Sequence, residues 1–161
     1  MRARDLAVEY PTVSPDSSAL DAARLVAEHR LAGLIVIGSD RRPIAVIPGS
    51  QLLRYIIPSH VRDDPALARV YDEQHADRLC AKLAGKSVAD LLAEERTALP
   101  AVDANATAME IASVMAANRS PVVAVSGAPD RTDAPMIGVI TVAHLLDRLL
   151  PGPTADQGPA A

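Results

Sequence analysis

Two stretches of the chain share the same order of polar and apolar positions. Segments 13–23 and 102–112 each pass from a polar cluster to regularly spaced apolar residues, and the second begins 89 positions after the first. In each stretch a hydroxyl residue stands three positions before a carboxylate, which is the spacing of a helix-capping box. Apolar residues then recur at helical spacing. We therefore expect helices at about 19–30 and 108–119.

Each predicted helix is followed by two short apolar runs. Residues 34–37 and 122–125 are rich in β-branched side chains and too short for helices, which favours buried strands. A polar turn separates each of them from a second apolar run, at 44–47 in the first half and at 136–140 in the second. Each half is therefore expected to contain a β-hairpin.

A last helix closes each half, at about 50–57 and 142–150, and a proline ends each of these helices. Each half thus reads strand, helix, strand, strand, helix. One unit of this size buries its sheet poorly, whereas two packed units bury it well. The sequence predicts an α/β fold of two pseudo-twofold-related repeats, each a small mixed sheet faced by two helices. The expected divisions are a first repeat at 1–57, a linker at 58–85, a second repeat at 86–150 and a disordered tail at 151–161.

The linker, 58–85, belongs to neither repeat. An apolar stripe over 66–84 predicts one amphipathic helix that Gly85 ends. This helix extends a dimer interface, docks a partner or caps the edge of the module. His75 and Cys80 diverge by about 140° around such a helix, which is poor geometry for shared metal ligation. Cys80 is expected to be a small buried side chain.

Composition and charge exclude several functional classes. Hydrophobic residues make up 49% and charged residues 22%, as in a globular protein. Aromatic residues make up only 2% and the net charge is −4, which argues against nucleic-acid binding by stacking or by phosphate contacts. The N-terminus lacks the apolar region of a secretion signal, and no apolar run approaches the ~20 residues that span a bilayer. We expect a cytoplasmic protein without nucleic-acid partners and without direct membrane insertion.

The sequence also lacks the familiar motifs of catalysis. It contains no Gly-x-Ser-x-Gly elbow, no complete Gly-x-x-x-x-Gly-Lys-Ser/Thr phosphate loop, no His-Glu-x-x-His and no paired Cys-x-x-Cys. The four histidines are scattered, and the single cysteine allows no intrachain disulfide. We therefore expect no catalytic residues, no metal site and no catalytic cofactor.

The stretch 138–144 resembles the signature of the cystathionine-β-synthase (CBS) domain, which is Gly, two apolar residues, Thr or Ser, two variable residues and Asp. With the repeat, the order of elements and the apolar strand beginning at Pro121, the chain is similar to a tandem CBS pair, or Bateman module, over 1–57 and 86–150. The resemblance implies adenosine-type ligands (AMP, ADP, ATP or S-adenosylmethionine) bound in clefts between the repeats. It also implies disc-shaped dimers and control of a partner enzyme, transporter or channel.

The second repeat carries the stronger candidate ligand site. Thr141 stands where a strand meets a helix, and a helix N-terminus offers backbone N–H groups and a positive dipole end to a phosphate. The resemblance assigns the ribose hydroxyls to the signature Asp, whose place His144 takes here. It also implies that the backbone of 97–100 faces an adenine, and Arg119 is the candidate phosphate partner. The alternative is that Thr141 only caps its helix and that His144 is a surface residue. The candidate residues are Thr97, Ala98, Leu99, Pro100, Arg119, Ser120, Pro121, Gly138, Ile140, Thr141 and His144.

The equivalent first-repeat stretch, 45–51, departs further from the signature. Ala replaces Gly, Pro48 replaces Thr and Gln51 replaces Asp. Pro48 has neither an N–H nor a hydroxyl to offer a phosphate. Gln51 retains the ability to hydrogen-bond a ribose. The candidate residues of this weaker site are Thr12, Val13, Pro48 and Gln51.

These observations predict a free-standing regulatory module. An adenosine-type ligand is expected to shift the packing of the repeats and so to modulate an unknown protein partner. The alternatives are a ligand-free dimeric interaction module, in which the linker and the dimer face act, and a regulatory subunit of a transporter or enzyme. We expect a homodimer because Ala-rich helix faces exceed what one thin sheet covers. The face concerned consists of Ala19, Ala22, Ala23 and Val26.

Overall fold

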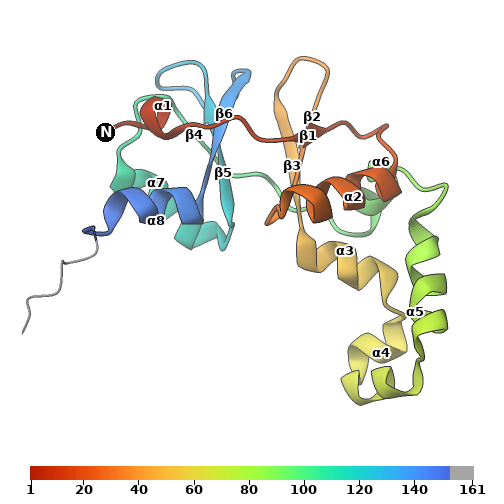
Figure 1. Ribbon diagram of the computed structural model, residues 1–161. Coiled ribbons are helices and arrows are strands. Elements are labelled where there is room, and N and C mark those ends of the chain that lie inside the picture. The colour runs from red at the N-terminus through yellow and green to blue at the C-terminus, as the bar shows by residue number, and fades with distance from the viewer. Residues whose placement is uncertain (153–161) are drawn as a thin grey trace, which may run out of the picture.

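The computed structural model describes residues 1–152, which contain two three-stranded sheets (Figure 1). In the first sheet, β1 (Thr12–Val13) pairs in parallel with β2 (Gly33–Ile37). β2 in turn pairs antiparallel with β3 (Pro43–Pro48). The two strands expected in the hairpin of this half are confirmed to within one residue at each end.

The second sheet repeats the same order and the same strand directions. β4 (Ala101–Val102) is parallel to β5 (Val122–Ser126), and β5 is antiparallel to β6 (Met136–Thr141). Both hairpins carry a register shift at the end of their first strand. The repeat in the sequence is therefore a repeat in structure, and the expected α/β fold with two small mixed sheets is confirmed.

Two long helices occupy equivalent places, α2 (Ala19–His29) and α7 (Ala108–Asn118). Each begins at the predicted hydroxyl N-cap, which is Ser18 or Thr107, and each ends at an arginine with positive φ. Thr107 forms the full reciprocal box with Glu110, and the hydrogen bonds from Thr107 hold the pKa of that carboxyl below its ordinary value. Local capping therefore fixes the start of both helices.

The remaining helices complete each half. α3 (Gly49–Ile56) follows the first sheet and α8 (Val142–Leu149) follows the second, as expected. A short helix also precedes each half: α1 (Ala3–Leu6) comes before β1, and α6 (Val88–Glu94) comes before β4. α6 begins with the full capping box of Ser87 and Asp90, whereas at the start of α1 only the Arg2 N–H donates to the Asp5 carboxylate, at 2.9 Å.

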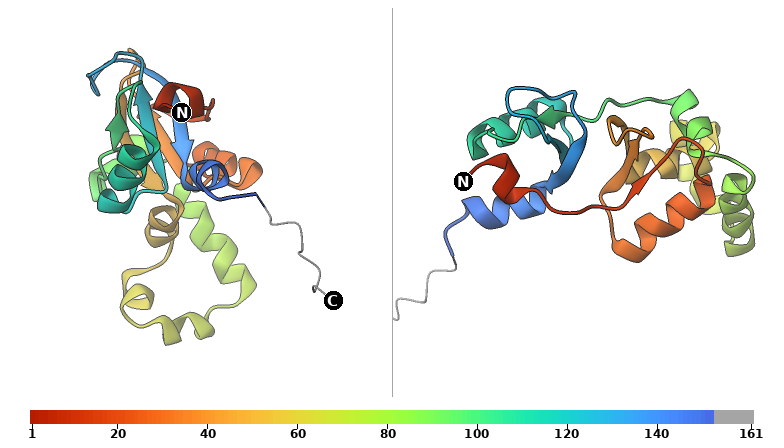
Figure 2. Two further views of the ribbon diagram at one scale, coloured as in Figure 1. Left: turned by 90° about the vertical axis from the view of Figure 1, so that its left-hand side faces the viewer. Right: turned by 90° about the horizontal axis from the view of Figure 1, so that it is seen from above.

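Each short leading helix packs on the other repeat. Ala3 and Leu6 of α1 are buried in the core of the second repeat, while Val88 and Leu91 of α6 are buried in the core of the first. Seen from above, the N-terminal segment runs from the second repeat across to the first (Figure 2). The two cores are therefore completed by chain that leads into the opposite half.

The segments between these helices and the sheets are exchanged in the same way. Val8 and Val139 exchange two backbone hydrogen bonds of 3.0 Å, and the Val46 N–H donates to the Thr97 carbonyl at 3.0 Å. Gly138 lies beside this crossing, where a Cβ would come within 2.9 Å of the Val8 carbonyl oxygen. One edge strand of each sheet, β3 in the first and β6 in the second, is thus paired with chain from the other repeat.

A shared apolar cluster joins the two sheets. Its buried members are Ile35, Val46, Leu99, Val122, Ala124, Met136 and Val139. Tyr10 packs against this cluster, and its hydroxyl donates to the Gly33 carbonyl at 2.9 Å. Burial raises the pKa of Tyr10 above its ordinary value. The repeats therefore share one apolar interface in addition to the exchanged segments.

The prediction of one amphipathic helix over 66–84 is wrong. The region forms α4 (Ser59–Asp63), a 3-10 helix (Pro65–Val70), α5 (Glu73–Cys80) and a second 3-10 helix (Ala81–Leu83). Figure 1 shows α4 and α5 projecting away from the two sheets.

Local capping explains this interruption. Proline occupies the first turn of the 3-10 helix, and Asp72 then starts a new helix by accepting the His75 N–H at 2.8 Å.

The prediction that Cys80 is buried is also wrong, because Cys80 is exposed. Within residues 1–152, no group of three His, Cys, Asp or Glu residues is placed to hold a metal ion. No helix in this part of the chain has the length and apolar character needed to cross a membrane. Apart from Pro151 and Gly152, the predicted tail lies outside the described residues.

The packing of α1 on the second repeat predicts how a substitution in α1 changes the stability of the protein. Leu6, 1% exposed, belongs to the second-repeat core although it precedes the first repeat. Leu6→Ala is expected to lower the free energy of unfolding by about 2–5 kcal/mol in urea titration, because it leaves a cavity in that core. Leu53→Ala, at a position 59% exposed on α3, is the control and should change it by less than about 0.5 kcal/mol. Equal effects of the two variants would contradict the exchanged packing.

Candidate ligand sites

The second-repeat signature forms a capped helix start. Thr141 is the N-cap of α8, and its Oγ1 accepts the His144 N–H at 3.2 Å. The Val142 N–H donates to the Pro121 carbonyl at 3.0 Å. Two of the first three N–H groups of α8 are therefore engaged within the protein. What this helix start offers a ligand is the Ala143 N–H and the hydroxyl hydrogen of the half-buried Thr141.

Arg119, Ser120 and Pro121 lie beside an apolar groove between α7 and α8. The buried Ser120 hydroxyl donates to the Val122 carbonyl at 2.7 Å, so it is engaged within the protein. Arg119 is exposed and ends α7. The groove has a volume of about 490 Å³. Its other lining residues are Ala112, Met115, Ala116, Val142, Leu145, Leu146 and Leu149.

The segment 97–100 runs between the sheets. The Thr97 carbonyl accepts the Val46 N–H of β3, and the Pro100 carbonyl accepts the Ala124 N–H of β5 at 2.9 Å. β3 leads into the first-repeat signature, so the structure pairs 97–100 with that signature's strand. This differs from the sequence-based grouping of 97–100 with Thr141. By the same exchange, the segment around Val8 lies on β6, the strand that leads into Thr141.

Three of the predicted contact residues contribute their side chains to cores. Ile140 is fully buried in the second-repeat core, and Val13 lies in the first-repeat core. Leu99 belongs to the cluster between the sheets, whereas its neighbour Ala98 is exposed. At the buried positions only the backbone is left for ligand contacts.

A polar cleft of about 450 Å³ opens between the two repeats. It brings Thr12 of the first repeat together with Gly138 of the second, two residues that the sequence had placed in different sites. Glu9 and Arg41 line the same cleft, and both are exposed. The remaining lining residues are Tyr10, Pro11, Met136 and Ile137.

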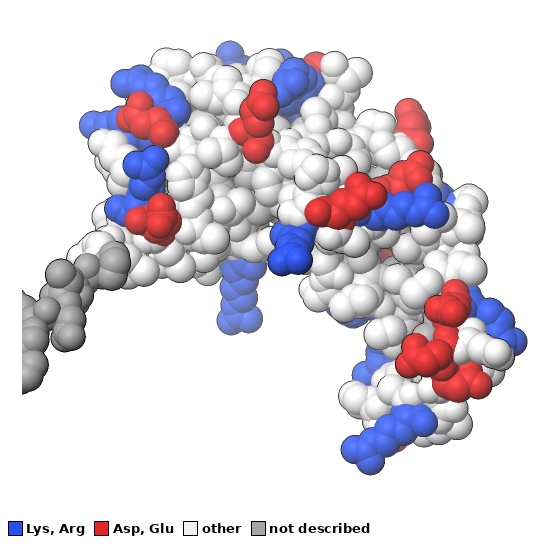
Figure 3. Space-filling view, in the orientation of Figure 1, with Lys and Arg blue, Asp and Glu red and all other residues white. Residues whose placement is uncertain are grey.

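Sequence reasoning missed Glu9 and Arg41, because nothing in their spacing brings an N-terminal residue and a hairpin turn together. The Arg41 carbonyl accepts the Met136 N–H at 3.0 Å, which ties the turn between β2 and β3 to the second sheet. The face seen in Figure 3 carries acidic and basic side chains scattered over a largely uncharged surface. That face therefore carries no broad basic or acidic patch.

Polar groups of the first-repeat signature also bond within the protein, but to different partners. Pro48 is the N-cap of α3 without a side-chain bond, and the Gly49 N–H donates to the Ala32 carbonyl at 3.1 Å. Gln51 is only 8% exposed, and its Nε2 donates to the Glu95 carbonyl at 2.6 Å. The amide of Gln51 therefore bonds to the end of α6.

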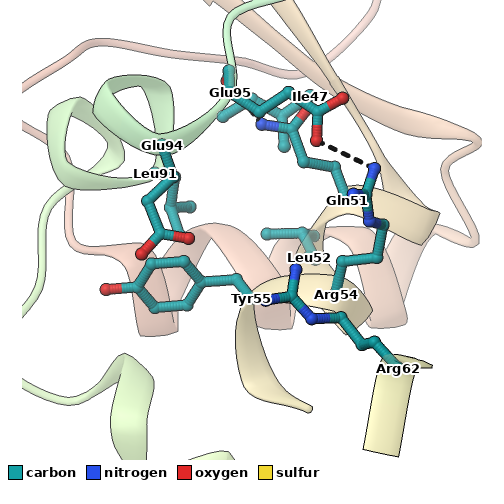
Figure 4. A pocket seen from close by; sticks show the side chains of 9 residues that line it. All are labelled: Ile47, Gln51, Leu52, Arg54, Tyr55, Arg62, Leu91, Glu94 and Glu95. Carbon is teal, nitrogen blue, oxygen red and sulfur yellow. Dashed lines mark hydrogen bonds and ion pairs between the residues drawn. The ribbon is translucent and has the colours of Figure 1, made fainter. Parts of the chain in front are cut away.

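A small cavity of about 90 Å³ lies beside Gln51, between α3, α4 and α6 (Figure 4). Within the described residues, the buried Oε1 of Gln51 has no hydrogen-bond partner. Leaving such a group unpaired costs about 1–3 kcal/mol. The cavity is lined by Ile47, Gln51, Leu52, Arg54, Tyr55, Arg62, Leu91, Glu94 and Glu95.

Comparison with known proteins places this geometry in a family. The family model of the CBS domain matches residues 3–58. A CBS domain-containing protein of unknown function from Kribbella flavida is 42% identical, with a TM-score of 0.76, over 92% of this chain and 97% of that one. Among curated proteins, none matches this chain.

More distant solved structures share the fold. CBSX2, a CBS-pair protein of Arabidopsis thaliana, was solved in complex with AMP; that structure is 20% identical, with a TM-score of 0.61, over 91% of this chain and 94% of its own. The CBS domain of a bacterial CNNM/CorC family Mg²⁺ transporter, solved with ATP, is 16% identical, with a TM-score of 0.60, over 91% of this chain and 85% of its own. The family model, the Kribbella protein and the two matching sheets together show that this chain belongs to the CBS-domain proteins, as a tandem CBS pair.

Proposed function

We propose that this protein is a non-catalytic regulatory module that binds an adenosine-type ligand between its repeats and thereby modulates a partner protein. The observation that carries the proposal is the cleft to which both repeats contribute, with Glu9 and Thr12 on one side and Gly138 on the other. CBS-domain proteins are generally regulatory, and the AMP and ATP complexes of CBSX2 and of the Mg²⁺ transporter support this choice of ligand.

The cleft has groups suited to each part of a nucleotide. The Arg41 guanidinium matches a phosphate, with which it can form two parallel hydrogen bonds. The Glu9 carboxylate can accept hydrogen bonds from the ribose hydroxyls. Ile137, which is half exposed, offers apolar surface for the base. A volume of about 450 Å³ lies in the range of small-molecule sites.

A ligand in this position would act on the packing of the repeats. Thr12 starts β1 of the first sheet, Arg41 lies in the turn of its hairpin, and Gly138 is part of β6. A ligand that contacts these groups favours whichever arrangement of the repeats brings them closest. The partner responds to that arrangement in this proposal, so no bond of the ligand needs to be broken.

The site is tested by isothermal titration calorimetry with AMP and ATP. Arg41→Ala is expected to weaken binding about tenfold, because a charge-assisted hydrogen bond to phosphate is lost. Arg42→Ala is the matched control, since Arg42 is an adjacent arginine that pairs with Asp40 at 3.4 Å and does not line the cleft. Thr141→Ala should leave binding within about twofold. If Thr141→Ala abolishes binding and Arg41→Ala does not, the ligand lies at the second-repeat signature around Thr141 and His144.

Thermal melting separates the sensor from the ligand-free alternative. AMP, ADP, ATP or S-adenosylmethionine is expected to raise the Tm of the wild-type protein in proportion to the logarithm of its concentration, since only binding to the native state stabilises in this way. A Tm unchanged by all four at millimolar concentration would favour a ligand-free interaction module or a regulatory subunit of a transporter or enzyme.

We also propose that the protein is a homodimer joined through the groove between α7 and α8. Part of the helix face expected to form the dimer contact is buried within the protein itself, because Ala19 and Ala22 are 0% and 2% exposed. Leu146 and Leu149, in contrast, are 46% and 40% exposed beside the apolar groove. A twofold axis places the same groove on both partners, so one apolar face covers the other.

The dimer is tested by light scattering coupled to size-exclusion chromatography. Leu146→Glu is expected to convert a dimer into a monomer of 16.9 kDa, because it places a charge in the covered face. Leu53→Glu is the matched control, since Leu53 is the fifth residue of α3 as Leu146 is of α8. A monomeric wild-type protein, or dissociation by Leu53→Glu alone, would contradict this interface.

A further inference from the structure

We propose that the cavity beside Gln51 is a second ligand site, which binds a small zwitterion, namely a free α-amino acid with no side chain or a very short one. The site lies within the first repeat and the insertion, where α3, α4 and α6 meet (Figure 4). It shares no lining residue with the cleft between the repeats. The inference therefore does not depend on nucleotide binding.

The first observation is the buried amide of Gln51. Its Nε2 is fixed by the 2.6 Å bond to the Glu95 carbonyl, which also fixes the position of Oε1. Oε1 is buried and, within the described residues, has no donor. A buried acceptor of this kind is normally satisfied, so a ligand that carries N–H groups fits here.

The second observation is the balance of charge around the cavity. Two guanidinium groups and two carboxylates line it. Arg54 and Glu95 pair with each other at 3.1 Å. Arg62 and Glu94 have no ion-pair partner among the described residues, and they enter from α4 and α6 respectively (Figure 4). One cation and one anion are therefore left to meet a ligand.

This charge balance selects the class of ligand. A simple anion would meet the Glu94 carboxylate, and a simple cation would meet the Arg62 guanidinium, so each would gain one contact and suffer one repulsion. A zwitterion satisfies both groups at once. Its ammonium group can donate to Glu94 and to Oε1 of Gln51, while its carboxylate accepts the fork of Arg62.

The size of the cavity limits the side chain. An apolar cavity of about 150 Å³ holds one benzene molecule, and this cavity is about 90 Å³. Its apolar lining is Ile47, Leu52 and Leu91. Glycine and alanine fit a space of this size with their charged head toward the arginine, whereas a nucleotide does not.

Binding would also link the insertion to the first repeat. Arg62 belongs to α4, while Glu94 and Gln51 belong to helices that pack on the first sheet. A ligand bridging Arg62 and Glu94 holds α4 against α6. The concentration of the free amino acid would thus set the fraction of molecules in which the projecting insertion is held in this position.

The test is calorimetric titration of the full chain with glycine and with L-alanine. Saturable binding of these probes is expected, together with a rise in Tm. Acetate, which lacks the ammonium group, methylamine, which lacks the carboxylate, and L-tryptophan, which exceeds the cavity, should not bind. Binding of acetate or methylamine with the affinity of glycine would overturn the zwitterion assignment, and the absence of binding by both amino acids at millimolar concentration would overturn the site.

Matched variants locate the site. Arg62→Ala and Glu94→Gln are each expected to weaken glycine binding about tenfold, since each removes one charged contact. Arg69→Ala and Glu73→Gln alter exposed insertion residues that do not line the cavity, and they should leave binding unchanged. Arg41→Ala should also leave glycine binding unchanged, which separates this site from the nucleotide cleft. Unchanged binding in both Arg62→Ala and Glu94→Gln would overturn the proposal.

Discussion

The exchange of backbone pairing between the two repeats determines most of what this structure can do. Val8 bonds to Val139 on the edge of the second sheet, and Thr97 bonds to Val46 on the edge of the first. An edge strand without a partner exposes hydrogen-bonding groups and invites aggregation, and here the β3 and β6 edges are each paired at their centre with chain from the other half. Because the segment around Val8 then enters β1, the polar cleft beside it is lined by both repeats. A ligand in that cleft would contact both repeats at once.

The elements within each half could be predicted because their signals are local. Ser18 and Thr107 start their helices, and runs of β-branched residues form the strands, within one residue of the expected positions. The exchange could not be predicted, because nothing near Val8 or Thr97 in the sequence identifies an edge strand that is distant in the chain. The insertion was misjudged for a different reason. An apolar stripe counts side chains and ignores the backbone, whereas the capping carboxylate of Asp72 starts a new helix inside the predicted one.

The candidate sites show the same division between local and distant information. The signature correctly located a strand-to-helix junction at Thr141, but its glycine has a structural role that only the fold reveals. Gly138 leaves room for the backbone of Val8, so this signature position serves the exchange. Glu9 and Arg41 face one cleft because the crossing segment and a hairpin turn meet there. No spacing rule connects two such residues. The sequence thus indicated the junction at Thr141 but not which distant segment pairs with the strand that leads into it.

The two halves share a frame and differ in what surrounds it. At equivalent positions after the last strand, His144 follows a capped helix start in the second repeat, whereas Gln51 is buried against the end of α6 in the first. The two sheets match in strand order and in pairing. The differences between the halves described above lie instead at helix starts, in the grooves beside them and in the insertion. A duplicated fold can in this way surround two matching sheets with unlike surfaces, an apolar groove on the second repeat and a charged cavity on the first.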